Sequence, residues 1–306
     1  MGTLTLGNLS VDAAREFLDR LGFVLVVDNC RRGCLHCPAY GTTSPVRYMS
    51  ATVMAQLLSG LDTLFRDLGV SKPRRTIQCW RLSDPLDYHF TIGRRLYDVI
   101  YVAEMWLLYL DQGIYFVTNG SEGRETAQAA LRAIARRPEL VSQAKLTITP
   151  YDVLWGTDRY RQDLLDDIEI LAPLWSLRSV RIEDHRNALF RINIKTAAAR
   201  EPEARDFVYE LLRTLSLDAD SLIEDSTRVC FKPIYDLGTT SGAASPVPGA
   251  IKILNERGER YKPVEGRTQV QTGIGTDLST FKVDMYAFAD LPMTDHQGAP
   301  VTVSLE

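Results

Sequence analysis

Cysteine and histidine are scarce in this 306-residue chain, with five and four residues, and no apolar run approaches the length of a membrane span. A transmembrane helix needs about 20 apolar residues, so we expect no membrane-spanning segment. An odd, small number of cysteines argues against a disulfide framework and indicates a reducing compartment, so we expect a cytoplasmic protein. The formal charge of −4 gives no general attraction to nucleic acid or anionic membranes, and we expect neither as a partner.

Three of the five cysteines, Cys30, Cys34 and Cys37, stand in a C-x3-C-x2-C spacing. They follow the apolar run 23–27, which has the length and composition of a strand covered on both faces. Thiolates this close in sequence can converge on one metal centre, and three of them leave one iron of a [4Fe–4S] cluster open to another ligand. The alternative is a zinc site closed by His36, which would make the chain a zinc-stabilised binding protein.

Candidate strands and helices alternate along the chain after this segment. Apolar periodicity predicts strands at 76–82, 113–118, 145–149, 190–195 and 228–235, with helices at 50–68, 93–111, 122–137, 160–174 and 201–215. Together with the run at 23–27, these strands predict an α/β fold built as a partial (β/α)6 TIM-like barrel.

A Gly-, Ser- and Pro-rich stretch at 238–249 ends the alternating pattern. We therefore expect an N-terminal helical extension over 1–22, the barrel over 23–244, and a C-terminal β-rich segment over 245–306 that covers the barrel opening. The last segment contains no cysteine, so a single cluster is the simplest interpretation.

The cysteine spacing, in a loop after the first predicted strand, resembles the signature of radical S-adenosylmethionine (SAM) enzymes. The resemblance implies that Cys30, Cys34 and Cys37 hold a [4Fe–4S] cluster and that the amino and carboxylate groups of SAM bind the open iron. Reductive cleavage of SAM would then give a 5′-deoxyadenosyl radical that takes a hydrogen atom from the substrate. An electron donor such as flavodoxin or ferredoxin would be a partner.

Further residues at the predicted strand ends resemble SAM-contacting positions of that family. Ser83 and Asp84 stand where the family has the second Gly and the Glu of a Gly-Gly-Glu-Pro stretch, which implies that Asp84 accepts a hydrogen bond from the SAM ammonium group. Without the cysteines, Ser-Asp-Pro is an ordinary turn and threonine simply suits strands. The residues expected near SAM are His36, Ser83, Asp84, Thr118, Asn119, Thr147, Thr149, Asn193 and Lys195.

The fifth predicted strand alternates polar and apolar residues. Arg191, Asn193 and Lys195 share one face, which must meet a solvated cavity or polar partners because unpaired buried polar groups are costly. A barrel lumen that holds SAM would satisfy them. A stripe of polar residues that faces solvent is the alternative.

Cys79 and Cys230 lie outside the cluster motif, and a free cysteine is most often a small buried hydrophobe. The alternative is a thiol that returns a hydrogen atom to a substrate radical, as in some radical SAM epimerases. For the substrate we expect a small polar metabolite, such as a sugar, nucleoside or amino-acid derivative, in biosynthesis. Modification of a peptide by epimerisation or cross-linking is the alternative.

Overall fold

The computed structural model describes residues 4–30, 45–80, 83–120, 124–148, 157–181, 185–196, 200–233, 235–236, 251–252, 270–284, 289–295 and 297–305. Helices and strands alternate over most of this length, and one four-stranded sheet is entirely parallel. The α/β class predicted from the sequence is therefore confirmed. No helix in these ranges is long and apolar enough to span a bilayer.

The strands that follow the expected alternation form two groups. β7 (Ile114–Thr118), β8 (Val141–Ile148), β9 (Phe190–Thr196) and β10 (Val229–Pro233) pair in chain order as the parallel sheet. β2 (Leu21–Asp28) pairs parallel with β4 (Gln78–Trp80). The indole nitrogen of Trp80 donates a hydrogen bond to the backbone oxygen of Tyr115 at 2.6 Å, which ties β4 to β7.

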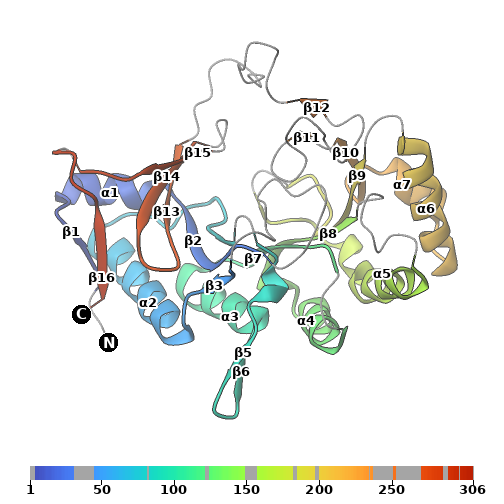
Figure 1. Cartoon of the computed structure of the whole chain (residues 1–306), viewed down its shortest axis with the longest axis horizontal. Helices are drawn as coiled ribbons and strands as arrows, with labels where there is room; N and C mark the ends of the chain where they lie inside the picture. The colour runs from blue at the N-terminus through green and yellow to red at the C-terminus, as the bar shows by residue number, and fades with distance from the viewer. Residues whose placement is uncertain are drawn as a thin grey trace.

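Helices lie between these strands along the chain: α2 (Ala51–Asp67), α3 (Val99–Leu110), α4 (Arg124–Arg136), α5 (Asp158–Leu171), α6 (Glu201–Thr214) and α7 (Ala219–Glu224). Figure 1 shows them as an arc along one side of the strands. Their buried faces join the strands in one large apolar cluster that includes Phe65, Trp106 and Phe116. The short 3-10 helices η1 (Pro85–Asp87), η2 (Pro138–Leu140) and η3 (Ala172–Ser176) complete the connections.

Side-chain caps explain where several helices begin. The Ser50 hydroxyl accepts from the Val53 N–H at the start of α2, and the Thr157 hydroxyl accepts from the Tyr160 N–H at the start of α5. Asp98 caps α3, so the prediction of a helix from residue 93 was wrong at its start. The preceding residues instead form a hairpin of β5 (Phe90–Ile92) and β6 (Arg95–Tyr97).

The ends of the described chain meet in the sheets. β1 (Leu4–Gly7) pairs antiparallel with β16 (Thr302–Leu305), and α1 (Val11–Asp19) follows β1. β13 (Val270–Ile274) pairs parallel with β2, and β14 (Thr280–Asp284) and β15 (Ala289–Pro292) extend that sheet antiparallel (Figure 1). Three two-residue strands complete the set: β3 (Arg47–Tyr48), β11 (Tyr235–Asp236) and β12 (Ile251–Lys252).

Close packing joins the C-terminal strands to β2. Gly273 lies opposite Phe23 of β2 on one side and Phe281 of β14 on the other. A Cβ atom at position 273 would collide with the ring of Phe281, so glycine lets the ring lie across the strand. Phe281 packs there against Phe23, Leu25 and Val283 in a small apolar cluster.

Candidate active site

The carboxyl ends of parallel strands lie at one edge of a sheet, where α/β folds usually hold their active sites. Cys30 follows the end of β2 and is only 8% exposed. Asn29 before it has a φ of 67°, and its side-chain amide donates to the backbone oxygen of Pro45 at 2.9 Å. That bond joins the two ends of segment 31–44, which lies outside the described residues together with Cys34, His36 and Cys37.

Asp84 links the ends of β4 and β7. Its carboxylate accepts from the Thr118 hydroxyl at 2.8 Å, from the Asn119 N–H at 3.2 Å and from the Leu86 N–H at 2.9 Å. The side chain is 5% exposed, so these donors compensate the burial of its charge. These hydrogen bonds hold the carboxylate in one position even when no ligand is bound.

Two further hydrogen bonds fix this corner. The Ser83 hydroxyl donates to the backbone oxygen of Val27 at 3.1 Å, which joins the turn after β4 to the end of β2. The Tyr160 hydroxyl of α5 donates to the backbone oxygen of Asn119 at 3.4 Å. Ser83, Asp84, Thr118 and Asn119, all expected near SAM, therefore belong to one connected network at the strand ends.

The expected side chains of β8 and β9 lie on a polar face that continues onto β10. Alternate residues of these strands, Leu146, Ile192 and Ile194, are buried in the cluster shared with the helices. The others point away from the helices by pleat alternation. We call them the polar face: Lys145, Thr147, Arg191, Asn193, Lys195, Cys230 and Lys232.

Strand register sets the neighbours on the polar face. Thr147, Asn193 and Cys230 lie side by side on β8, β9 and β10. Asn193 is 5% exposed, and its side-chain oxygen has no hydrogen-bond partner among the described residues. A buried amide oxygen without a donor is costly, which favours a bound group with a hydrogen-bond donor.

The polar face is also strongly basic. Burial lowers the pKa of Lys195 to about 8, and the charge of Lys232 adds to this; Cys230 acts in the opposite direction, and Lys145 adds a smaller lowering. Burial likewise lowers the pKa of Lys232. Lys145 donates to the Tyr115 hydroxyl at 2.8 Å.

The two remaining cysteines differ in their surroundings. Cys79 is 0% exposed within the large apolar cluster, and burial raises the pKa of its thiol well above the usual value. Cys230 is partly exposed and lies on the polar face beside Asn193. Cys230 is therefore the more accessible of the two thiols.

The predicted site residues that the structure describes lie in two groups. Ser83, Asp84, Thr118 and Asn119 form the network at the strand ends, and Thr147, Asn193, Lys195 and Cys230 share the polar face. Thr149 lies outside the described residues, as do Cys34, His36 and Cys37.

Sequence reasoning missed Lys145, Lys232 and Tyr115 as site residues. β8 begins at Val141 rather than at 145, because the polar Ser142 and Gln143 are buried inside the strand and hide its apolar pattern. The alternation of polar and apolar residues along β8 and β10 could have placed the two lysines on the polar side of their strands. Their proximity depends on a register that one strand alone does not reveal.

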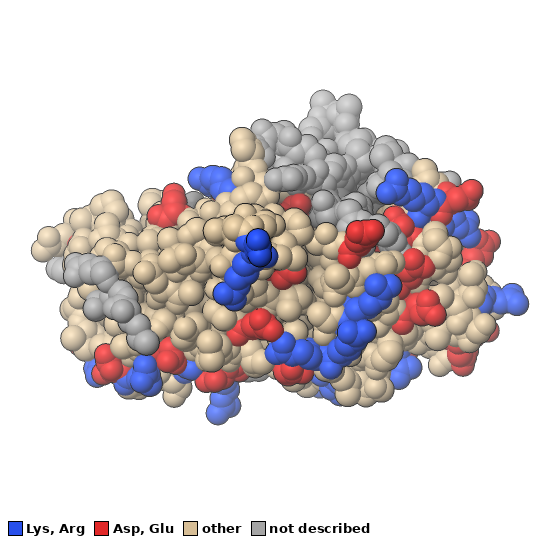
Figure 2. Space-filling view, turned by 90° about the horizontal axis from the view of Figure 1, so that it is seen from below, with Lys and Arg blue, Asp and Glu red and all other residues tan. Residues whose placement is uncertain are grey.

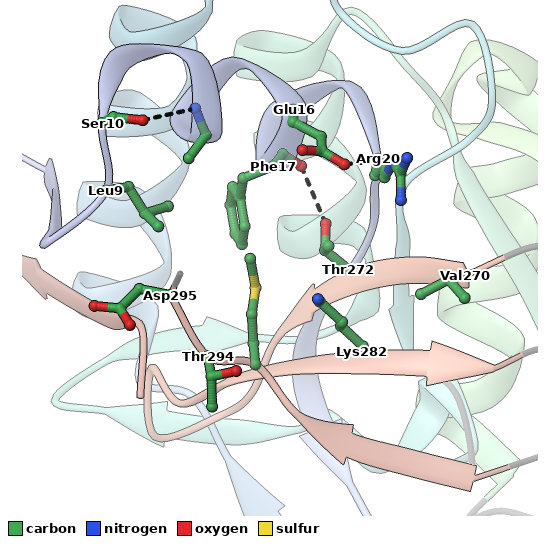
Figure 3. A pocket seen from close by; sticks show the side chains of 12 residues that line it. Leu9, Ser10, Glu16, Phe17, Arg20, Val270, Thr272, Lys282, Thr294 and Asp295 are labelled. Carbon is green, nitrogen blue, oxygen red and sulfur yellow. Dashed lines mark hydrogen bonds and ion pairs between the residues drawn. The ribbon is translucent and has the colours of Figure 1, made fainter. Parts of the chain in front are cut away.

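A separate cavity of about 560 Å³ lies between α1 and the strands β13–β15 (Figure 3). Glu16 of α1, Arg20 at the C-cap of that helix and Lys282 of β14 line it. At its side the Thr272 hydroxyl donates to the backbone oxygen of Phe17 at 3.1 Å. Of the residues expected near the cluster or SAM, those that the structure describes do not line this cavity.

Three described groups near the strand ends could take part in binding a ligand. Cys30 supplies a buried thiol there, Asp84 a fixed carboxylate, and Asn193 a buried oxygen that needs a donor. No family model matches the chain, and no curated protein matches it at a significant level.

Proposed function

We propose that this protein is a single-cluster radical SAM enzyme that acts on a small polar metabolite. One observation carries the proposal: the first cysteine of the C-x3-C-x2-C motif follows directly from the end of β2, at the edge where β4 and β7 end in a hydrogen-bonded polar network. A cluster loop in that place would have its ligands beside side chains able to hold SAM.

The finer architecture that we propose is a partial (β/α)6 barrel of β2, β4, β7, β8, β9 and β10. Chain order, the parallel pairings within each group and the outer arc of helices support it (Figure 1). In such a barrel the polar face lines the lumen, and the charged side chains find a solvated or ligand-filled space.

In this proposal Cys30, Cys34 and Cys37 hold a [4Fe–4S] cluster and leave one iron open for SAM. When bound, the cluster would pass one electron from the donor to SAM, and its cleavage to methionine and a 5′-deoxyadenosyl radical would supply the group that takes a hydrogen atom from the substrate. An electron donor such as flavodoxin or ferredoxin, in a reducing cytoplasmic compartment, would serve the cluster.

The chain's own side chains position SAM and exclude water. Asp84 is proposed to accept from the SAM ammonium group, since the donors from Leu86, Thr118 and Asn119 fix its carboxylate at the strand ends. Asn193 is proposed to accept from a ribose hydroxyl, which would satisfy its buried oxygen. Ser83 and Thr118 keep the strand ends together and so hold Asp84 in register with β2 and β7.

Anaerobic reconstitution with iron and sulfide tests the proposal. The wild-type chain should take up about four irons, turn brown and cleave SAM under reduction. The variants Cys30→Ala, Cys34→Ala and Cys37→Ala should each lose most of the iron. Cys79→Ala is the matched control, because Cys79 lies buried in the apolar cluster, and it should keep its iron.

A different metal would overturn the proposal. One zinc per chain with no uptake of iron, lost in His36→Ala as well as in the cysteine variants, would instead support the zinc-stabilised binding protein.

A further inference from the structure

Positive charge gathers on the polar face in a way that the proposed cofactors do not explain. In the register of β9 and β10, Lys195 lies beside Lys232, and in that of β8 and β9, Lys145 lies beside Arg191. Paired residues on neighbouring strands are about 4.8 Å apart in the backbone, so each pair holds two like charges close together.

No acidic residue shares this face within the described parts of β7 to β10. The groups that shift the pKa of Lys195 through their charge are Lys232, Lys145 and Cys230, and none is a carboxylate. The outer surface differs, since Figure 2 shows acidic and basic side chains interspersed over the face that it presents. Lys195 and Lys232 therefore have no described carboxylate beside them on this face.

Uncompensated buried cations are costly, and proteins keep them where an anion binds. The deeper cations have partners: Lys145, 4% exposed, donates to the Tyr115 hydroxyl, and Arg191, 9% exposed, donates to the backbone oxygen of Ser226. Lys195 and Lys232 are less buried and lie nearer the carboxyl ends of their strands. These two ammonium groups are the ones that a ligand at the strand ends would reach.

SAM by itself does not balance this charge. It carries one carboxylate against a sulfonium and an ammonium group, so its net charge is positive. We propose that the substrate carries an anionic oxygen group, a carboxylate or a phosphate, and that Lys195 and Lys232 bind it. That this anion belongs to a substrate rests on the proposed function. The anion site itself rests on Lys195 and Lys232.

Calorimetric titration of the full chain tests the anion site with two probes, inorganic phosphate and malonate, at constant ionic strength. The titrations use the anaerobically reconstituted protein saturated with SAM. At least one probe should bind, and Lys232→Met and Lys195→Met should each weaken that binding by roughly tenfold or more. Preference for phosphate or for malonate tells which of the two groups the substrate carries.

Two control variants separate the site from general charge effects. Lys282→Met removes a lysine from β14, away from the polar face, and should leave anion affinity unchanged. Lys232→Arg keeps the charge and should keep most of the affinity. Circular dichroism and the melting temperature of every variant show whether it is folded.

Three results would overturn the inference. They are that neither probe binds the wild-type chain, that Lys282→Met loses as much affinity as Lys232→Met, or that the anion binds the reconstituted chain only when SAM is omitted. The last result would mean that the lysines serve the SAM carboxylate. Titration of the iron-free chain distinguishes the two proposals. If the chain takes up no iron but still binds the anion through its lysines, the anion site stands and the radical SAM proposal is wrong.

Discussion

The hydroxyl of Thr118, at the end of β7, lies 2.8 Å from the carboxylate of Asp84 and donates a hydrogen bond to it. The same hydroxyl accepts from the Gly120 N–H at 3.1 Å. One buried side chain thus couples the turn after β4 to the turn after β7. Both turns carry residues that we place around SAM.

Replacement of Thr118 by valine should break this coupling at nearly constant volume. Asp84 loses one donor and the Gly120 N–H loses its acceptor, so we expect the free energy of unfolding to fall by about 1 to 2 kcal/mol. SAM binding to the reconstituted protein should weaken as well. Thr147→Val is the control for unfolding, since the Thr147 side chain forms no hydrogen bond with the described residues, and its effect should stay within about 0.5 kcal/mol. Equal losses in both variants, measured by urea unfolding, would contradict the prediction.

Gly120 should tolerate no side chain. Its φ is 71°, and a Cβ atom would lie 2.7 Å from a carboxylate oxygen of Asp167 and 3.2 Å from a methyl of Leu146. We expect Gly120→Ala to lower the free energy of unfolding by about 2 kcal/mol or more, through backbone strain and contact together. Gly69 has a φ of 64° with open space around it, so Gly69→Ala should cost only the strain, about 1 kcal/mol. A similar cost at both positions would show that the contact with Asp167 is easily relieved.

Local patterns in the sequence predicted the elements with a strong period of their own. The apolar run at 23–27 became β2, and the alternation over 190–195 became β9 with Asn193 and Lys195 on one face. Ser10 caps α1 as its position before an amphipathic segment suggests. These features depend on neighbouring residues alone, so a single sequence shows them.

Features that depend on distant residues were not predictable in the same way. β13 pairs with β2, about 250 residues away in the chain. Position 273 must be glycine because the ring of Phe281 lies across it. The hairpin before α3 was missed because its turn rests on Gly93 with a φ of 62°, inside a segment that also suits a helix. The closeness of Lys195 and Lys232 likewise needed the register of two strands.

Thiol labelling should distinguish Cys230 from Cys79. Cys230 is partly exposed, whereas Cys79 is fully buried and burial raises the pKa of its thiol. Because the thiolate is the reactive form, maleimide at neutral pH should label Cys230 in the native protein and Cys79 only after unfolding. Mass spectrometry of the digested chain measures both. Rapid labelling of native Cys79 would remove the argument that favours Cys230 as a hydrogen-atom donor.

The lowered pKa of Lys195 should appear in the pH dependence of stability. Its pKa is about 8 in the folded chain against an ordinary value of 10.5, so between these pH values the unfolded chain holds a proton that the folded chain has released. Lys195 therefore makes stability rise with pH in this window, by up to about 3 kcal/mol. Below about pH 8 both states are protonated and its unfavourable contribution is constant.

Lys195→Met should remove that slope and make the chain more stable than the wild type at neutral pH. The charged groups that face Lys195 are Lys232 and Cys230 of β10 and Lys145 of β8, so the variant also relieves repulsion on its neighbours. Urea unfolding from pH 7 to 10.5, in buffer free of phosphate and carboxylates, measures the effect, with Lys282→Met as the control that keeps the wild-type slope. A Lys195→Met chain that is less stable at pH 7 and keeps the slope would show that Lys195 is paired in the folded state, because only a compensated ammonium group stabilises the fold while it is charged.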